Sequence, residues 1–329
     1  MITGVVCMSH SPLLDRNRTD AECEAKYFAA VGLAQEFTVM GEPELAVVFF
    51  PDHLTGFFYS LMPSFCVGAA GTSIGDFGTA PGQLDIPEEV AMDCAASCIA
   101  DGVDVAVSLK MTVDHGAVQP IEMLSAQPTL TRIVPIFINC AAAPRPTFDR
   151  VRALGRAVGR WADARSERIL LIASGGLSHD PPLPSLKGAS PDARQRLVNG
   201  GVPTHADRVL RQHRVLGEGA KFVAGTSQLR ALNPEWDKSF LDAVVAGNLS
   251  WLDGLDDEDI TAIAGRGAHE VRSWIAALAA IQIRAAYKAD VLFYAPVPEW
   301  ITGMGILTAA AAEGARERKP PTQSRFQST

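Results

Sequence analysis

Short apolar runs recur along the first part of the chain, and several of them are followed within a few positions by a histidine. The runs Ile2–Cys7, Leu45–Phe50, Val103–Leu109 and Arg168–Ser174 are nearly continuous and rich in β-branched residues. Such runs are typical of strands that are covered on both faces. Segments with helical spacing alternate with them, as in folds built on a parallel sheet. We therefore predict an α/β fold with a mainly parallel or mixed central sheet flanked by helices.

Helix signals are clearest between the second and third of these runs. In the segment Pro87–Ala100 a proline and two glutamates suit the first turn, and Gly102 suits the end. Ile133–Ile138 reads as a further strand, in which Pro135 is tolerated only near the start or at an edge. The chain from residue 181 to residue 285 is expected to be mostly helical. The other helices that we expect are Thr147–Arg165, Asp192–Asn199, Pro234–Ala246, Asp257–Ala264 and His269–Ile283.

No internal repeat and no break in composition marks a linker in the 329 residues. We expect residues 1–312 to form a single domain. The segment from Glu313 to Thr329 is rich in Arg, Lys, Pro, Gln and Ser, which predicts a disordered tail.

Charge and cysteine content narrow the class of protein. A formal net charge of −8 without a dense basic run argues against a nucleic-acid surface. The six cysteines are irregularly spaced without a CxxC pair, which favours free thiols in a reducing compartment. Cys94 and Cys98 lie four apart on a predicted helix and read as core-facing residues. Together with the absence of a signal peptide, these features predict a soluble, cytoplasmic protein.

One uncharged segment is long enough to span a bilayer. Leu54–Gly75 carries no charged side chain, but a proline and several glycines interrupt it. Because helical continuity is lacking, we interpret it as a buried loop and pocket wall, and we expect no membrane association.

The histidines indicate where the chemistry lies. His10, His53, His115 and His179 each follow a predicted strand, and the carboxyl ends of strands border the ligand crevice in open α/β sheets. Neutral imidazole is the commonest metal ligand and a common general base. The pattern therefore predicts a metal-centred active site at the carboxyl ends of the strands.

A carboxylate would complete such a site. His10 and His53 with one carboxylate would form a 2-His-1-carboxylate face, which leaves open positions on non-haem Fe(II). Glu270, which opens a helix after a glycine-containing stretch, is our choice for this ligand, although a glutamate there also complements a helix dipole. The competing carboxylates are Asp52, Asp76 and Asp114.

The three remaining histidines have plainer interpretations. His269 is expected to be structural or to contact a metal ligand without binding the metal itself. His205 and His213 lie in a helical stretch with Arg208, Arg211 and Arg214, which we interpret as a solvated surface.

Six segments together resemble a known family. In order, they are Ser9-His10-Ser11-Pro12, Phe50-Pro51-Asp52-His53, Gly75-Asp76-Phe77-Gly78, Val113-Asp114-His115-Gly116, Ser174-Gly175-Gly176-Leu177-Ser178-His179 and His269-Glu270-Val271. The chain resembles the class III (type II, protocatechuate 4,5-dioxygenase-like) extradiol dioxygenases from about residue 2 to Gly303. No single segment is diagnostic, but six in the same order are a strong match.

The resemblance implies an activity and a role for each residue. It implies Fe(II) bound by His10, His53 and Glu270, with His115 as proton donor and His179 as proton acceptor. The expected reaction cleaves, with O2, the ring of a catechol that bears a propionate or propenoate chain, and gives a 2-hydroxy-6-oxo-dienedioate. The expected partners are this catechol, O2 and further copies of the chain in a homo-oligomer.

Two other functions are compatible with the same metal ligands. A zinc-dependent hydrolase is one, because His/His/Glu sites also hold Zn(II) with an open position. A non-catalytic, metal-binding member of the same fold is the other. The presence of both His115 and His179 argues against the second, because a binding module needs no acid–base pair.

Overall fold

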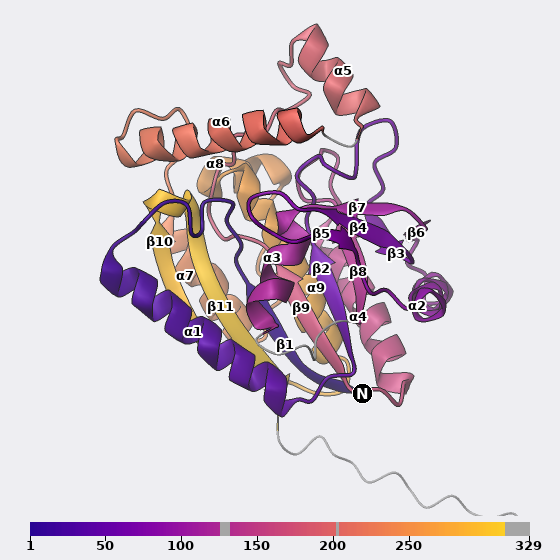
Figure 1. Cartoon of the computed structure of the whole chain (residues 1–329). Coiled ribbons are helices and arrows are strands. Elements are labelled where there is room, and N and C mark those ends of the chain that lie inside the picture. The colour runs from indigo at the N-terminus through magenta and orange to yellow at the C-terminus, as the bar shows by residue number, and fades with distance from the viewer. Residues whose placement is uncertain (126–131, 202–203, 313–329) are drawn as a thin grey trace, which may run out of the picture.

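The computed structural model describes residues 1–125, 132–201 and 204–312 (Figure 1). Within these residues the larger sheet has eight strands in the order β10-β11-β1-β9-β2-β8-β3-β6. Its strands are β1 (Ile2–Met8), β2 (Leu45–Phe50), β3 (Phe65–Gly68), β6 (Ala106–Ser108), β8 (Ile133–Ile138), β9 (Ile169–Ser174), β10 (Tyr287–Val297) and β11 (Thr302–Ala311).

The sheet is mixed, as predicted. Its centre is parallel, because β9 pairs in parallel with β1 and β2, and β2 pairs in parallel with β8. The hairpin β10–β11 extends it beyond β1 in the antiparallel sense, and β3 is antiparallel to β8. The sequence did not predict β10 or β11.

A smaller sheet corrects one predicted strand. It has the order β5 (Pro81–Gln83), β4 (Gly71–Ile74), β7 (Met111–Val113). Of the predicted strand Val103–Leu109, only Ala106–Ser108 is extended, and it forms the edge strand β6 of the larger sheet. His115 therefore follows the short strand β7 instead.

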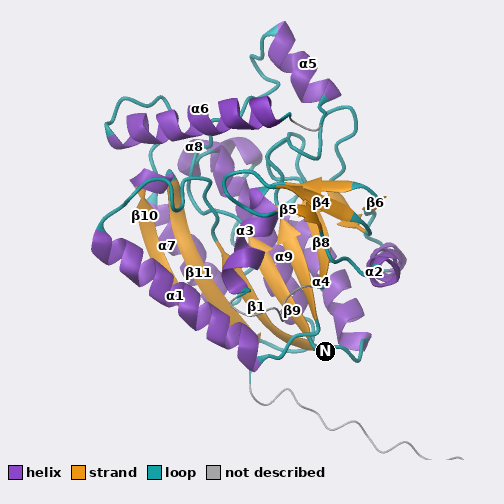
Figure 2. Cartoon of the chain, viewed as in Figure 1, coloured by secondary structure: helices purple, strands orange, loops and turns teal. Residues whose placement is uncertain are grey.

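Helices cover both faces of the larger sheet (Figure 2). They are α1 (Ala21–Met40), α2 (Glu88–Ala100), α3 (His115–Leu124), α4 (Phe148–Ala164), α5 (Pro191–Asn199), α6 (His205–Val223), α7 (Pro234–Val245), α8 (Asp257–Ala264) and α9 (Val271–Ile281). The helices expected from the sequence are confirmed to within about two residues at each end. Helices α1 and α3 were not predicted.

Two hydrophobic cores lie on the two faces, because side chains alternate along each strand. In β2, Val47 and Phe49 belong to the core under α4 and α9, whereas Val48 and Phe50 belong to the core under α1 and α3. All six residues of β2 are buried. This double coverage explains why the strand sequences are continuous apolar runs.

Pro135 lies in an inner strand and not at an edge. In β8 it pairs opposite Val48 of β2, and pairing of β8 with β3 begins one residue later, at Ile136. The proline is thus tolerated near the start of the strand, where only one neighbour is paired.

The uncharged segment Leu54–Gly75 is only partly the loop that we expected. It contains all of β3 and β4, and Phe65 is buried in the core. Among the described residues, no helix is both long and apolar enough to cross a bilayer.

Two further expectations concern cysteines and chain organisation. All six cysteines are free, and Cys94 and Cys98 are buried on α2, as predicted. The tail from Glu313 to Thr329 lies outside the described residues, and the single domain over residues 1–312 stays a prediction.

The contact between α4 and α9 gives a testable stability prediction. A Cβ atom at Gly155 would lie 2.1 Å from the carbonyl oxygen of Ala276 on α9, so Gly155→Ala must push the helices apart. We expect a loss of about 1–3 kcal/mol in the free energy of unfolding, measured by urea titration. The matched control is Gly32→Ala on α1, where no atom lies within 4 Å, and it should raise stability by about 0.5–1 kcal/mol. Equal stability of the two variants would contradict the close helix contact.

Candidate active site

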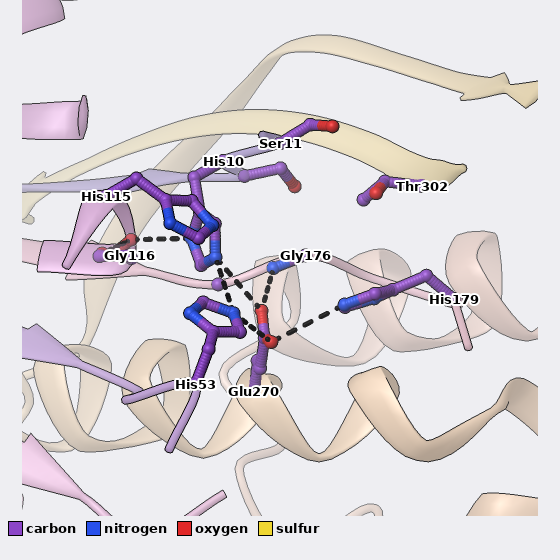
Figure 3. A network of polar contacts seen from close by, with 12 residues as sticks. His10, Ser11, His53, His115, Gly116, Gly176, His179, Glu270 and Thr302 are labelled. Atoms are coloured by element: carbon purple, nitrogen blue, oxygen red, sulfur yellow. Dashed lines mark hydrogen bonds and ion pairs between the residues drawn. The ribbon is translucent and has the colours of Figure 1, made fainter. Parts of the chain in front are cut away.

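The predicted histidines and the predicted glutamate meet at the carboxyl ends of the parallel strands. His10 follows β1, His53 follows β2 and His179 follows β9, while His115 is the first residue of α3. Glu270 ends the 3-10 helix Arg266–Glu270 and leads directly into α9. All five side chains are buried, and they converge in one place (Figure 3).

Three of these side chains bring ligand atoms close together. The Nε2 atoms of His10 and His53 are 3.3 Å apart. Glu270 lies 3.7 Å from His10 Nε2 through Oε2 and 3.4 Å from His53 Nε2 through Oε1. Ligands about 2.1 Å from one ion and at right angles to each other are separated by about 3 Å. The separations between the two imidazoles and the carboxylate are therefore close to those that a single metal ion requires.

The far nitrogen of each of these two rings is held by a hydrogen bond. His10 Nδ1 is 2.9 Å from the Ser174 hydroxyl, which itself donates to the carbonyl oxygen of Gly116. His53 Nδ1 is 3.1 Å from the Asp114 carboxylate, which can only accept. Both Nδ1 atoms therefore donate, and both Nε2 atoms are left to face the site. This is the arrangement typical of metal-binding histidines.

His115 and His179 flank this group on opposite sides (Figure 3). His115 Nδ1 lies 2.8 Å from the Asp76 carboxylate, and within the described part of the chain its buried Nε2 has no hydrogen-bond partner. His179 Nδ1 donates to the carbonyl oxygen of Leu177 at 2.9 Å. Its Nε2 lies 3.4 Å from Glu270 Oε1. The Nε2 atom of His179 thus faces the Glu270 carboxylate, and that of His115 is free of protein partners within the described residues.

The competing aspartates are occupied elsewhere. Asp52 accepts hydrogen bonds from three backbone N–H groups, and burial raises the pKa of its carboxyl to about 7. Asp114 is bound to His53 and caps α3 through the N–H of Gly116. Asp76 accepts from both the backbone N–H and the ring of His115. Glu270 is the carboxylate that reaches the paired Nε2 atoms.

Electrostatics at the site favour a bound cation. Burial lowers the pKa of His10 to about 3, so this ring is neutral. Burial opposes ionisation of Glu270 as well, but His179 and His10 hold its pKa well below its usual range. Burial also acts to lower the pKa of His53, yet Asp114 and Glu270 raise it to about 10. Asp114 holds the proton on Nδ1 of His53. A metal cation at Nε2 would therefore take the place of the second proton, which the negative charges of Asp114 and Glu270 attract to this ring.

The pKa of His179 is raised for a related reason. Burial lowers it, but the charge and hydrogen bond of Glu270 more than offset this effect. The ring is therefore able to take up a proton at Nε2 next to the carboxylate.

Glycines allow the close packing around His179. A Cβ atom at Gly267 would lie 2.0 Å from His179 Nε2, and one at Gly176 would lie 2.7 Å from its Cε1. The N–H of Gly176 donates to Glu270 Oε2 at 2.8 Å. Glycine is thus required at positions 176 and 267, because a side chain there would collide with the ring of His179.

A cavity of about 750 Å³ opens above the histidines. Leu54 and Phe58 form part of its wall, as expected for the uncharged segment. Phe57 instead stacks on Phe137 of the core at 3.8 Å between ring centroids. The cavity is large enough for a single-ring aromatic compound.

The arginine stretch of α6 corrects one prediction. His205 and His213 are exposed, as expected, but Arg211 and Arg214 line the cavity and do not simply face solvent. His269 is structural, as predicted: its ring nitrogens contact Thr261 and Arg272.

Some supporting residues were not found from the sequence. Ser174 links His10 to the carbonyl oxygen of Gly116. Asp237, fully buried on α7, accepts from both the N–H and the hydroxyl of Ser178, and from the Tyr294 hydroxyl. It fixes the turn that carries His179. No local motif marks Asp237, because its partners come from distant parts of the chain.

A family model described as the catalytic LigB subunit of aromatic ring-opening dioxygenase matches residues 4–305. The chain belongs to this family, so it is a ring-opening dioxygenase of the extradiol class that its six motifs resemble. Curated relatives include proteins named 2,3-dihydroxyphenylpropionate/2,3-dihydroxicinnamic acid 1,2-dioxygenase. The one from Mycolicibacterium gilvum is 46% identical over 93% of this chain and 97% of its own. The one from Pseudomonas putida is 44% identical over 92% and 97%, respectively.

A solved structure supports the fold alone. The crystal structure of an uncharacterized protein, JW3007, from Escherichia coli K12 superimposes with a TM-score of 0.51 at 14% identity. The match covers 92% of this chain and 98% of that one.

Proposed function

We propose that this chain is an Fe(II)-dependent dioxygenase that cleaves the ring of 3-(2,3-dihydroxyphenyl)propionate and of its propenoate analogue. One observation carries the proposal. The Nε2 atoms of His10 and His53 and the two carboxylate oxygens of Glu270 approach one another to 3.3–3.7 Å at the base of an aromatic-sized cavity, with a further imidazole on either side. The substrate named for relatives that are 42–46% identical over most of this chain supports the choice of catechol.

The donor set supports Glu270, and not His115, as the third ligand. His10, His53 and His115 also bring ring nitrogens within 4.8 Å of each other. However, the rings of His53 and His115 are stacked, with centroids 4.6 Å apart and planes at 13°. An imidazole binds a metal in its own plane, so an ion in the plane of His53 lies well outside the plane of His115. Two neutral imidazoles and one carboxylate with open positions suit Fe(II).

Bound at these three residues, Fe(II) would supply Lewis acidity toward the catechol hydroxyls and the electron-rich centre that O2 requires. His179 is then the base. Because Leu177 fixes the Nδ1–H of its ring, Nε2 carries the lone pair and can accept the proton that a catechol hydroxyl loses.

His115 is the acid on the other side. Its Nδ1 is held by Asp76, and this carboxylate would balance the positive charge of a ring protonated at Nε2. The unpartnered Nε2 can then donate a proton as the O–O bond breaks. Both oxygen atoms of O2 enter the product and the ring C–C bond beside the diol is the bond that is oxidised, so no external reductant is needed.

The proposal is tested by loading the purified protein with Fe(II) under anaerobic conditions and then adding 3-(2,3-dihydroxyphenyl)propionate and air. We expect a coloured ring-opened dienedioate with one O2 consumed per substrate. Oxidation to Fe(III) should abolish activity and ascorbate should restore it. Hydrolytic activity with Zn(II) in the absence of O2 would instead support a zinc hydrolase, and metal binding without any turnover would support a non-catalytic member of the fold.

We keep two further expectations about the protein in the cell. We propose a homo-oligomer in the cytoplasm, with the catechol and O2 as its small-molecule partners. Sedimentation velocity of the purified protein, and cell fractionation, measure these properties directly.

A further inference from the structure

The mouth of the cavity is basic although the chain is acidic. Arg196 of α5 and Arg211 and Arg214 of α6 line the same cavity as the four histidines, while the formal net charge of the chain is −8. In Figure 1, α6 lies at the end of the molecule at which the central parallel strands finish, and α5 projects beyond it. The one acidic residue of this lining, Asp207, is engaged by the backbone and hydroxyl of Thr204 in a helix cap.

Within residues 1–125, 132–201 and 204–312, none of the three arginines forms an ion pair with a carboxylate. The charge of Arg211 acts on the buried carboxylate of Asp114, which is itself hydrogen-bonded to the ring of His53. An arginine cluster that lines a ligand cavity and forms no ion pairs creates a positive potential there. Such a potential attracts an anionic ligand, and guanidinium groups match the geometry of carboxylates.

Arg211 is the best placed and the most firmly held of the three. It is half-buried, whereas Arg196 and Arg214 are exposed. Its Nη1 donates to the Thr55 hydroxyl at 3.0 Å, and its Nη2 donates to the carbonyl oxygen of His53 at 3.1 Å. These contacts anchor the guanidinium beside a predicted metal ligand. They use two of its five N–H donors, so three remain for a ligand.

We infer that Arg211 binds the side-chain carboxylate of the catechol substrate, with Arg196 and Arg214 adding to the positive potential at the cavity mouth. The inference rests on the proposed function. A propionate chain carries its carboxylate about 4 Å beyond the ring. A catechol that faces the histidines with its hydroxyls can therefore direct its side chain to the arginine end of the same cavity. Arg211 is thus the residue that selects catechols with an anionic chain.

The test compares a charged and an uncharged substrate of the same length, 3-(2,3-dihydroxyphenyl)propionate and 3-propylcatechol, with the Fe(II)-loaded enzyme. In Arg211→Met, kcat/KM for the propionate substrate should fall about 10–100-fold, since the charge-assisted hydrogen bonds are lost. The value for 3-propylcatechol should change less than about threefold. 3-Phenylpropionate, which has the carboxylate but no hydroxyls, should inhibit the wild type. It should bind Arg211→Met about 10–100-fold more weakly than the wild type.

Two further variants make the test specific. Arg211→Lys keeps the charge but not the forked geometry, so it should retain part of the preference for the propionate substrate. Lys221→Met removes a cation from α6 outside the cavity lining and should leave both substrates unchanged.

Different results overturn the inference and the proposed function. If Arg211→Met lowers kcat/KM equally for both substrates, Arg211 only holds the loop of His53. If it lowers neither, the carboxylate binds elsewhere. If the wild type cleaves neither catechol, the proposed function itself fails. If the wild type cleaves both catechols equally well, the carboxylate site is refuted but the proposed function is not.

Discussion

Replacing Glu270 with alanine is expected to abolish iron retention and ring cleavage together while the fold survives. Glu270 is the carboxylate that contacts His10, His53 and His179, so its loss leaves two neutral ligands for a divalent cation. Loss of a residue that merely orients a ligand typically costs 10–100-fold in metal affinity, and loss of a ligand should cost more than about 100-fold. Iron per subunit after anaerobic loading and gel filtration, together with O2 uptake, measures both effects.

The same loss is expected for His10→Ala and His53→Ala. Asp52→Asn is the control among the competing aspartates, because its carboxylate is turned to the N–H groups of Thr55, Gly56 and Phe57. It should retain iron. Circular dichroism should show that all four variants are folded. Full iron occupancy in purified Glu270→Ala would refute Glu270 as the third ligand and would move that role to another group, such as His115.

His115→Ala and His179→Ala should each reduce kcat by about 10²–10⁴-fold with iron still bound, the range typical of a lost general acid or base. The two variants should stop at different stages. In His179→Ala the catechol should bind but lose its proton inefficiently, so the spectrum of the anaerobic complex with the deprotonated catechol is weakened. In His115→Ala that complex should form normally, and the reaction should stall only after O2 is admitted.

The pH dependence separates the two roles further. The wild-type profile of kcat/KM should be bell-shaped, because one imidazole must be free and the other protonated. The variant without the base should lose the acidic limb, and the variant without the acid should lose the alkaline limb. Near wild-type turnover of either variant across the pH range would make its histidine structural and would refute the paired mechanism.

The parts of the fold that could be predicted are those in which burial is complete. Strands β1, β2 and β9 are covered on both faces and therefore read as continuous apolar runs. Strand β11 was missed because glycine and alanine make up much of it, and both have low β propensity. Helix α1 buries Tyr27, Ala30 and Ala34 at helical spacing. Exposed apolar residues such as Met40 hide that pattern.

The candidate site was predictable where histidines follow strands and a glutamate precedes a helix. His10, His53, His115, His179 and Glu270 are brought together as expected. Arg211 was assigned to solvent because its local sequence is that of a polar helix surface. Only the packing of α6 over the His53 loop places it at the cavity. Such a role depends on tertiary contacts, which no local pattern encodes.

The site also joins segments that lie far apart in the sequence. The hydroxyl of Ser9, beside His10, donates to the carbonyl oxygen of Gly303, which lies 294 positions further along, and β11 pairs directly with β1. During synthesis, the chain must be extended beyond Glu270 before the proposed ligands can assemble. A metal ion that binds only the assembled ligands stabilises the native state as a whole. Resistance of the apoprotein and the metal-loaded protein to proteolysis should consequently differ throughout the molecule and not merely around the cavity.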